Sequence, residues 1–116
     1  MRYTKVGEFY RVSRITGPSH NLLGLSISPD EPARVAMLKL RESQSTSQVD
    51  EEQLKQAVLG GLHEANAALG TSYFIDKIEY LPDDTPNLDV YSSLARSLIE
   101  HLVRSGQLRV GQTQRA

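Results

Sequence analysis

Basic side chains recur at alternating positions within the strand-like segments of this sequence. The alternation groups four cations with two large apolar residues: Arg11, Lys39, Arg41 and Lys77, with Phe9 and Ile75. A sheet face that combines cations with aromatic or apolar groups is suited to holding nucleic-acid phosphates and stacking bases. The same face permits a protein interface that also uses Ile15, or an ordinary solvated surface, because Glu8 and Glu79 are interspersed.

Polar residues whose side chains could take part in catalysis or binding also gather in two turn-like segments. The first holds Ser19, His20 and Asn21, and the second holds Asp83, Asp84 and Leu88. Paired carboxylates suit acid–base catalysis or cation binding, but beside two prolines they equally serve a turn and the helix start that follows it. An enzyme centred on His20 and the Asp pair is one hypothesis, and the sequence suggests no substrate for it.

The sequence lacks the residues that several common kinds of catalytic or metal site require. The chain contains no cysteine, which excludes disulfides, thiolate metal sites and a cysteine nucleophile. Its three histidines, His20, His63 and His101, are not at metal-ligand spacing, and no phosphate-binding glycine motif or nucleophile elbow is present. We therefore expect a non-enzymatic binding domain with no catalytic residue, no metal and no cofactor.

Charge is distributed unevenly along the 116 residues. The net charge is −1, yet residues 1–41 hold seven of the 13 basic residues and only three of the 14 acidic ones. The 39% of hydrophobic and 23% of charged residues are typical of a globular protein. No apolar run approaches the ~20 residues of a membrane helix, and no signal-type stretch follows the start. These features favour a cytoplasmic domain with no membrane partner.

Hydrophobic periodicity predicts the strands that position these residues. We expect strands over residues 8–16, 22–28, 35–41 and 72–81. The short connections between the first three favour an antiparallel meander. In the fourth strand the alternation predicts that Phe74, Ile78 and Tyr80 point inward and that Ile75, Lys77 and Glu79 point outward.

Two helices complete the set of elements. The first begins after an Asp50 capping box and ends at Gly70, while the second begins at Thr85 or Asn87 and ends at Gly106. Gly61 lies on the apolar stripe of the first helix, which predicts close approach to the sheet or to the other helix.

The resulting order is β-β-β-α-β-α. It predicts an α+β, two-layer sandwich in which a four-stranded sheet carries both helices on one face. We expect a single domain over residues 1–106 and a flexible tail over residues 107–116.

Three segments resemble a known family in their order and spacing. They are residues 16–24 (Thr-Gly-Pro-Ser-His-Asn-Leu-Leu-Gly), residues 57–65 (Ala-Val-Leu-Gly-Gly-Leu-His-Glu-Ala) and residues 89–95 (Asp-Val-Tyr-Ser-Ser-Leu-Ala). Together they are similar to domain IV of translation elongation factor G. The resemblance implies the two-layer β-β-β-α-β-α fold and the meeting of the turns at 17–21 and 83–89 at one tip, which reaches the decoding centre in the family.

The sequence departs from that family at functional positions. Leu88 stands where the family has a histidine, Pro18 interrupts the first loop, and this chain carries no GTPase domain. The resemblance therefore implies a stand-alone binding domain, with the ribosome or RNA as the expected partner of the basic face. The alternative is a protein partner or a homodimer through the same face. The acidic Asp83 and Asp84 oppose docking onto RNA phosphates.

Overall fold

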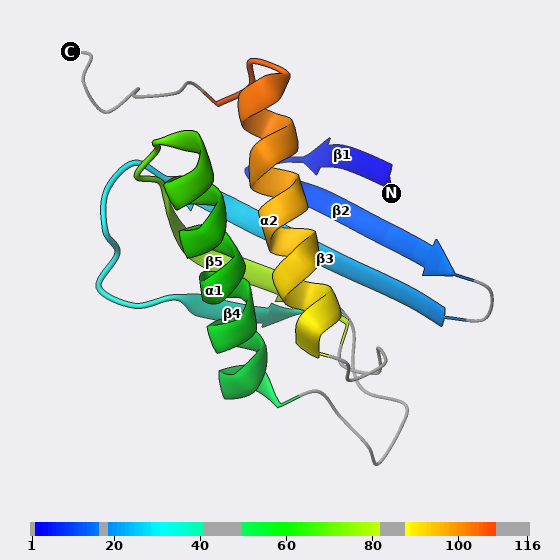
Figure 1. Cartoon of the computed structure of the whole chain (residues 1–116). Coiled ribbons are helices and arrows are strands. Elements are labelled where there is room, and N and C mark those ends of the chain that lie inside the picture. The colour runs from blue at the N-terminus through cyan, green and yellow to red at the C-terminus, as the bar shows by residue number, and fades with distance from the viewer. Residues whose placement is uncertain (1, 17–18, 41–49, 82–87, 109–116) are drawn as a thin grey trace.

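The computed structural model describes residues 2–16, 19–40, 50–81 and 88–108. Within them the strands are β1 (Arg2–Val6), β2 (Phe9–Thr16), β3 (Ser19–Ser28), β4 (Ala36–Lys39) and β5 (Phe74–Tyr80), and the helices are α1 (Glu51–Leu69) and α2 (Leu88–Arg104). Figure 1 shows α1 and α2 side by side on one face of a single sheet. The expected α+β class, with two layers, is confirmed.

The sheet has five strands in the order β1-β2-β3-β5-β4, so the expectation of four is wrong. The extra strand, β1, pairs antiparallel with β2 through a turn in which Gly7 has a φ of 61°. The expected meander holds for β2 and β3 only. β4 instead pairs parallel with β5 at the far edge, because the intervening helix α1 carries the chain back to the same end of the sheet before β5 begins.

The strand boundaries differ from the predicted ones where turn residues join a strand. β3 begins at Ser19, three residues earlier than expected, and β4 is limited to Ala36–Lys39. Residues 17–18 and Arg41 lie outside the described residues, as do the predicted caps Thr85 and Asn87 and the chain beyond residue 108.

A register shift between β3 and β5 changes which face Ile75 occupies. Leu25 pairs with Ile78, but Ile27 pairs with Ile75, so β5 carries one extra residue between the two pairs. The shift turns Ile75 toward the helices, where only 1% of it is exposed. The prediction that Ile75 points outward is therefore wrong, since strict alternation cannot anticipate a bulge.

Helix α1 begins and ends as the sequence predicts. The Asp50 carboxylate accepts a hydrogen bond from the Gln53 backbone N–H at 3.0 Å, and Gly70 ends α1 in the left-handed conformation with a φ of 70°. Gly61 packs against α2, where an added Cβ would lie 2.2 Å from the Ser92 carbonyl oxygen. The predicted close approach is thus confirmed, and its partner is the second helix.

Candidate functional site

The sheet face that the helices leave uncovered contains most of the predicted binding residues. We call it the outer face. Its position follows from Val12, which is fully buried beneath the helices, so its neighbours in β2 point the other way. The strand register then defines the outer face as Arg2, Thr4, Val6, Phe9, Arg11, Ser13, Leu22, Gly24, Ser26, Lys77, Glu79, Ala36 and Leu38.

An ion pair crosses the centre of the outer face. Arg11 Nε donates to Glu79 Oε1 at 2.9 Å and Arg11 Nη2 donates to Glu79 Oε2 at 3.2 Å, from strands on either side of β3. Gly24 of β3 lies beneath the pair, and a Cβ there would approach Glu79 Oε1 to 2.4 Å. Glu79 is 8% exposed, and its hydrogen bond raises the pKa of Arg11 against the opposing effect of burial.

A second ion pair lies beside the first, and in this one the cation is on β5 and the carboxylate is on the β1–β2 side. Lys77 Nζ on β5 contacts Glu8 Oε1 at 2.9 Å and Oε2 at 3.1 Å, and the Ser26 hydroxyl donates to Glu8 at 3.4 Å. The hydrogen bond with Glu8 raises the pKa of Lys77. Both predicted cations on this face are therefore neutralised by carboxylates of the same chain.

Lys39, like Ile75, was predicted on this face and does not lie on it. Lys39 pairs in register with Tyr80, whose side chain is in the core, so Lys39 occupies the helix side of the edge strand. This prediction is wrong because parallel pairing with β5 sets Met37 and Lys39, not Leu38, on that side. Arg41 lies outside the described residues, and so does the side chain of Ile15.

Apolar side chains flank the two ion pairs. Val6 and Leu38 are the large hydrophobic residues exposed in the described part of the chain, at 47% and 40%. Val6 lies in β1 next to the half-buried Phe9 of β2, and Leu38 lies in β4 at the opposite edge. The outer face thus has a nearly neutral charged centre between two apolar edges.

The predicted tip is described only in part. Asn21 is 5% exposed, and its Nδ2 donates to the Tyr91 hydroxyl at 3.4 Å, which joins the start of β3 to α2. Leu88 begins α2. Asp83, Asp84 and the side chains of Ser19, His20 and Leu88 lie outside the described residues, so the predicted acidic tip stays a prediction.

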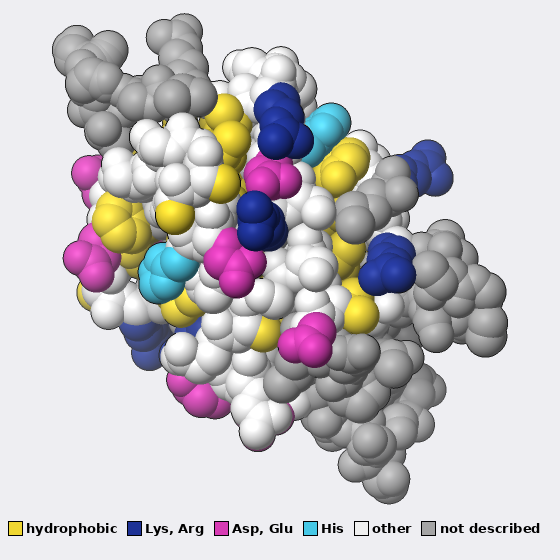
Figure 2. Space-filling view, in the orientation of Figure 1, with side chains coloured by type: hydrophobic (Ala, Val, Ile, Leu, Met, Phe, Trp, Pro, Cys, Tyr) yellow, Lys and Arg dark blue, Asp and Glu magenta, His cyan; other side chains and the backbone are white. Residues whose placement is uncertain are grey.

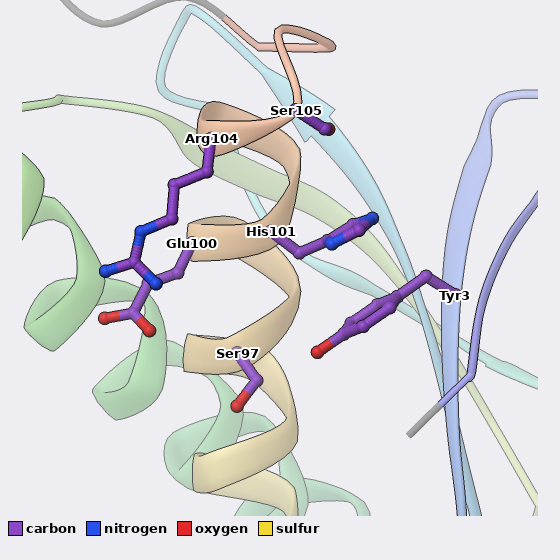
Figure 3. Close-up of a pocket in the computed structure, with 6 residues that line it drawn as sticks. All are labelled: Tyr3, Ser97, Glu100, His101, Arg104 and Ser105. Carbon is purple, nitrogen blue, oxygen red and sulfur yellow. The ribbon is translucent and has the colours of Figure 1, made fainter.

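A hollow between β1 and α2 was not anticipated by the sequence, because β1 itself was missed. The rings of Tyr3 and His101 stack there with their centroids 3.9 Å apart and their planes at 4° (Figure 3). The hollow has a volume of about 440 Å³. Its carboxylate, Glu100, is hydrogen-bonded to Arg96 at 3.1 Å, and the His101 imidazole has no hydrogen-bond partner among the described residues. The stack docks β1 and offers no nucleophile–base pair.

Within the described ranges no three His, Asp or Glu side chains are grouped to hold a metal ion, and no helix is long and apolar enough to cross a membrane. No family model, no curated protein and no solved structure matches the chain. The resemblance to domain IV of elongation factor G therefore stays a prediction, and the function has to be argued from the geometry.

Proposed function

We propose that this chain is a non-enzymatic, cytoplasmic protein-interaction domain that self-associates through its outer face. The observation that carries the proposal is the pairing of Arg11 with Glu79 and of Lys77 with Glu8 between the exposed Val6 and Leu38. A phosphate-binding surface needs cations whose charge is available to the ligand. A face with compensated charge and exposed apolar edges is better suited to a protein partner.

A second copy is the partner that fits best, because the outer face is complementary to itself. β3 is the central strand, so a two-fold axis along it exchanges β1 with β4 and β2 with β5. Arg11 of one copy then opposes Glu79 of the other, and the Val6 edge opposes the β4 edge with Ala36 and Leu38. Such an isologous contact closes as a dimer.

The size of the face predicts a weak dimer. Five strands ~4.8 Å apart span roughly 24 Å, and the eight residues of β2 span roughly 26 Å. The footprint is therefore at most about 600 Å² per copy, somewhat below the ~800 Å² of a standard interface. We expect association that depends on concentration in the micromolar range or above.

Sedimentation equilibrium over a range of concentrations tests the proposal. We expect the mass to rise from 12.9 kDa toward twice that value, and Leu38→Glu to hold the protein as a monomer. Ala67→Glu, which adds the same charge to an exposed position on α1, is the matched control and should associate like the parent protein.

The same set of proteins also tests the alternative that the outer face binds RNA. Single-stranded RNA titrated at low salt, followed by fluorescence anisotropy, should show no saturable binding. A parent protein that is monomeric at every concentration, together with RNA binding that Lys77→Glu abolishes, would contradict self-association and support a nucleic-acid partner.

A further inference from the structure

A hollow on the helix side of the sheet is separate from the outer face. It lies between α1, the segment 31–35 that leads into β4, and the start of β5, and its volume is about 400 Å³. Its apolar lining includes the half-buried Val35, Leu59 and Phe74. Small-molecule sites in proteins have volumes of ~300–1,000 Å³ and mainly apolar walls. Size and lining therefore suit a small ligand with an apolar body.

The rim of this hollow carries an excess of cations. The cations Arg34 and Lys55 line it against the single carboxylate of Glu31, and His63 lies on the same lining. Arg34 and His63 are exposed and make no ion pair with a described residue. Lys55 pairs at 3.0 Å with Glu52, three residues earlier on the exposed surface of α1. Surface pairs of this kind are weak, so Lys55 can exchange Glu52 for a ligand.

The helix-bearing side of the molecule shows the same combination. At its α1 margin, hydrophobic side chains lie beside a histidine, with both basic and acidic side chains nearby (Figure 2). Over the neighbouring α2, basic side chains alternate with acidic ones.

We propose that this hollow binds a small amphiphilic carboxylate, with its apolar chain against Leu59 and Phe74 and its carboxylate between Arg34 and Lys55. Arg binds carboxylates through two parallel hydrogen bonds, and Lys adds a second charge-assisted contact. The apolar chain supplies affinity through burial, and the cationic rim selects an anionic head over a cationic one. The site is independent of self-association, since it uses the other side of the sheet.

Two-dimensional ¹H–¹⁵N NMR of the full chain, titrated with octanoate below its micelle concentration, tests the proposal. We expect saturable shifts of the amides of Val35, Leu59 and Phe74. Acetate, which lacks the chain, and octylammonium, which reverses the charge, should leave these amides unchanged at the same concentrations.

The double variant Arg34→Glu/Lys55→Glu should weaken octanoate binding about tenfold or more, because it replaces both attractions by repulsion. Arg104→Glu, at the end of α2, removes a cation distant from this hollow and should leave the affinity unchanged. Each variant's own spectrum checks that the fold is retained. Shifts centred on Tyr3 and His101, equal binding of octylammonium, or full affinity in the double variant would overturn the assignment.

Discussion

At the residue scale, the central feature of the outer face is the ion pair between Arg11 and Glu79. Glu79 is almost fully buried although it lies on the open side of the sheet, and Gly24 provides the space for its carboxylate. A carboxylate held in this way needs its cation, since an unpaired buried charge is strongly destabilising.

Removing that cation should reveal the difference between the two ion pairs. Arg11→Met is expected to lower the free energy of unfolding by on the order of 3 kcal/mol, because Glu79 stays buried without a partner. Lys77→Met should change it little, since Glu8 is 56% exposed and is solvated when alone. Urea unfolding of both variants measures the difference, and equal losses would show that burial of Glu79 is unimportant.

Tyr80 makes the stability of the fold depend on pH in the alkaline range. Burial, helped by the hydrogen bond that its hydroxyl donates to Glu51, raises its pKa above the ordinary 10.0. The folded protein therefore keeps this proton when the unfolded chain loses it, so stability falls as the pH rises above about 10.

Tyr80→Phe should remove part of that fall. We expect a loss of about 1 kcal/mol at neutral pH, from the missing hydrogen bond, and a flatter decline of stability between pH 9 and pH 11. Urea unfolding across this range gives both quantities. A decline as steep in Tyr80→Phe as in the parent protein would assign the dependence to other groups.

At the residue scale, the sequence placed Arg11 and Lys77 on the outer face, with Glu8 and Glu79 interspersed, but it did not predict which residues pair. Alternation within a strand decides which side a residue takes, and it succeeded for both. The pairings could not be predicted, because they require β3 to lie between β2 and β5 with Gly24 beneath the bridge. The charges of Arg11 and Lys77 are compensated for that reason.

Helices α1 and α2 approach each other closely at one position on the surface of α1, Gly61. Gly60 and Gly61 are adjacent, yet nothing lies within 4 Å of a Cβ placed on Gly60, whereas one on Gly61 would meet the Ser92 carbonyl oxygen. A substitution at Gly60 therefore tests helix propensity alone, whereas the same substitution at Gly61 also tests the packing of the two helices.

Alanine at the two positions should have opposite effects. Gly60→Ala is expected to stabilise the protein by about 0.5–1 kcal/mol, because alanine favours the helix. Gly61→Ala should destabilise it by roughly 1–3 kcal/mol, since the backbone of α2 has to move away. Thermal unfolding of the pair distinguishes these effects, and stabilisation by both would mean that the helices are not in close contact at Gly61.

At the element scale, the sequence predicted α1, α2, β2 and β5 and misplaced the edges of the sheet. Strand β1 has little apolar alternation, and its one strong signal is the two-residue turn at Gly7. β4 is short and exposed, so its residues specify neither its direction nor its neighbour. Edge strands are decided by tertiary pairing, which a local pattern does not contain.

At the scale of the whole molecule, the two layers leave two sides with different surfaces. The helix side carries interspersed acidic and basic side chains over α2 (Figure 2). The outer face has the charges at its centre fixed in pairs and its exposed large apolar residues, Val6 and Leu38, at the edges. The proposed self-association would cover the second side, and its two-fold axis predicts that Arg11 of one copy meets Glu79 of the other.

Exchanging the charges of the central pair tests that statement most directly. The double variant Arg11→Glu/Glu79→Arg keeps the pair within each chain and also within its own dimer. In a mixed dimer, however, Arg11 of the parent chain opposes an arginine, and Glu79 opposes a glutamate, so mixing is disfavoured. Uniform ¹⁵N labelling of the parent protein separates the species by mass in native mass spectrometry.

We predict that the parent protein and the charge-exchanged variant each form dimers, and that the mixed dimer falls well below the statistical half of all dimers after equilibration. Mixed dimers at the statistical proportion would contradict the proposed apposition of Arg11 and Glu79. Absence of dimers from the parent protein at every concentration would contradict self-association through the outer face altogether.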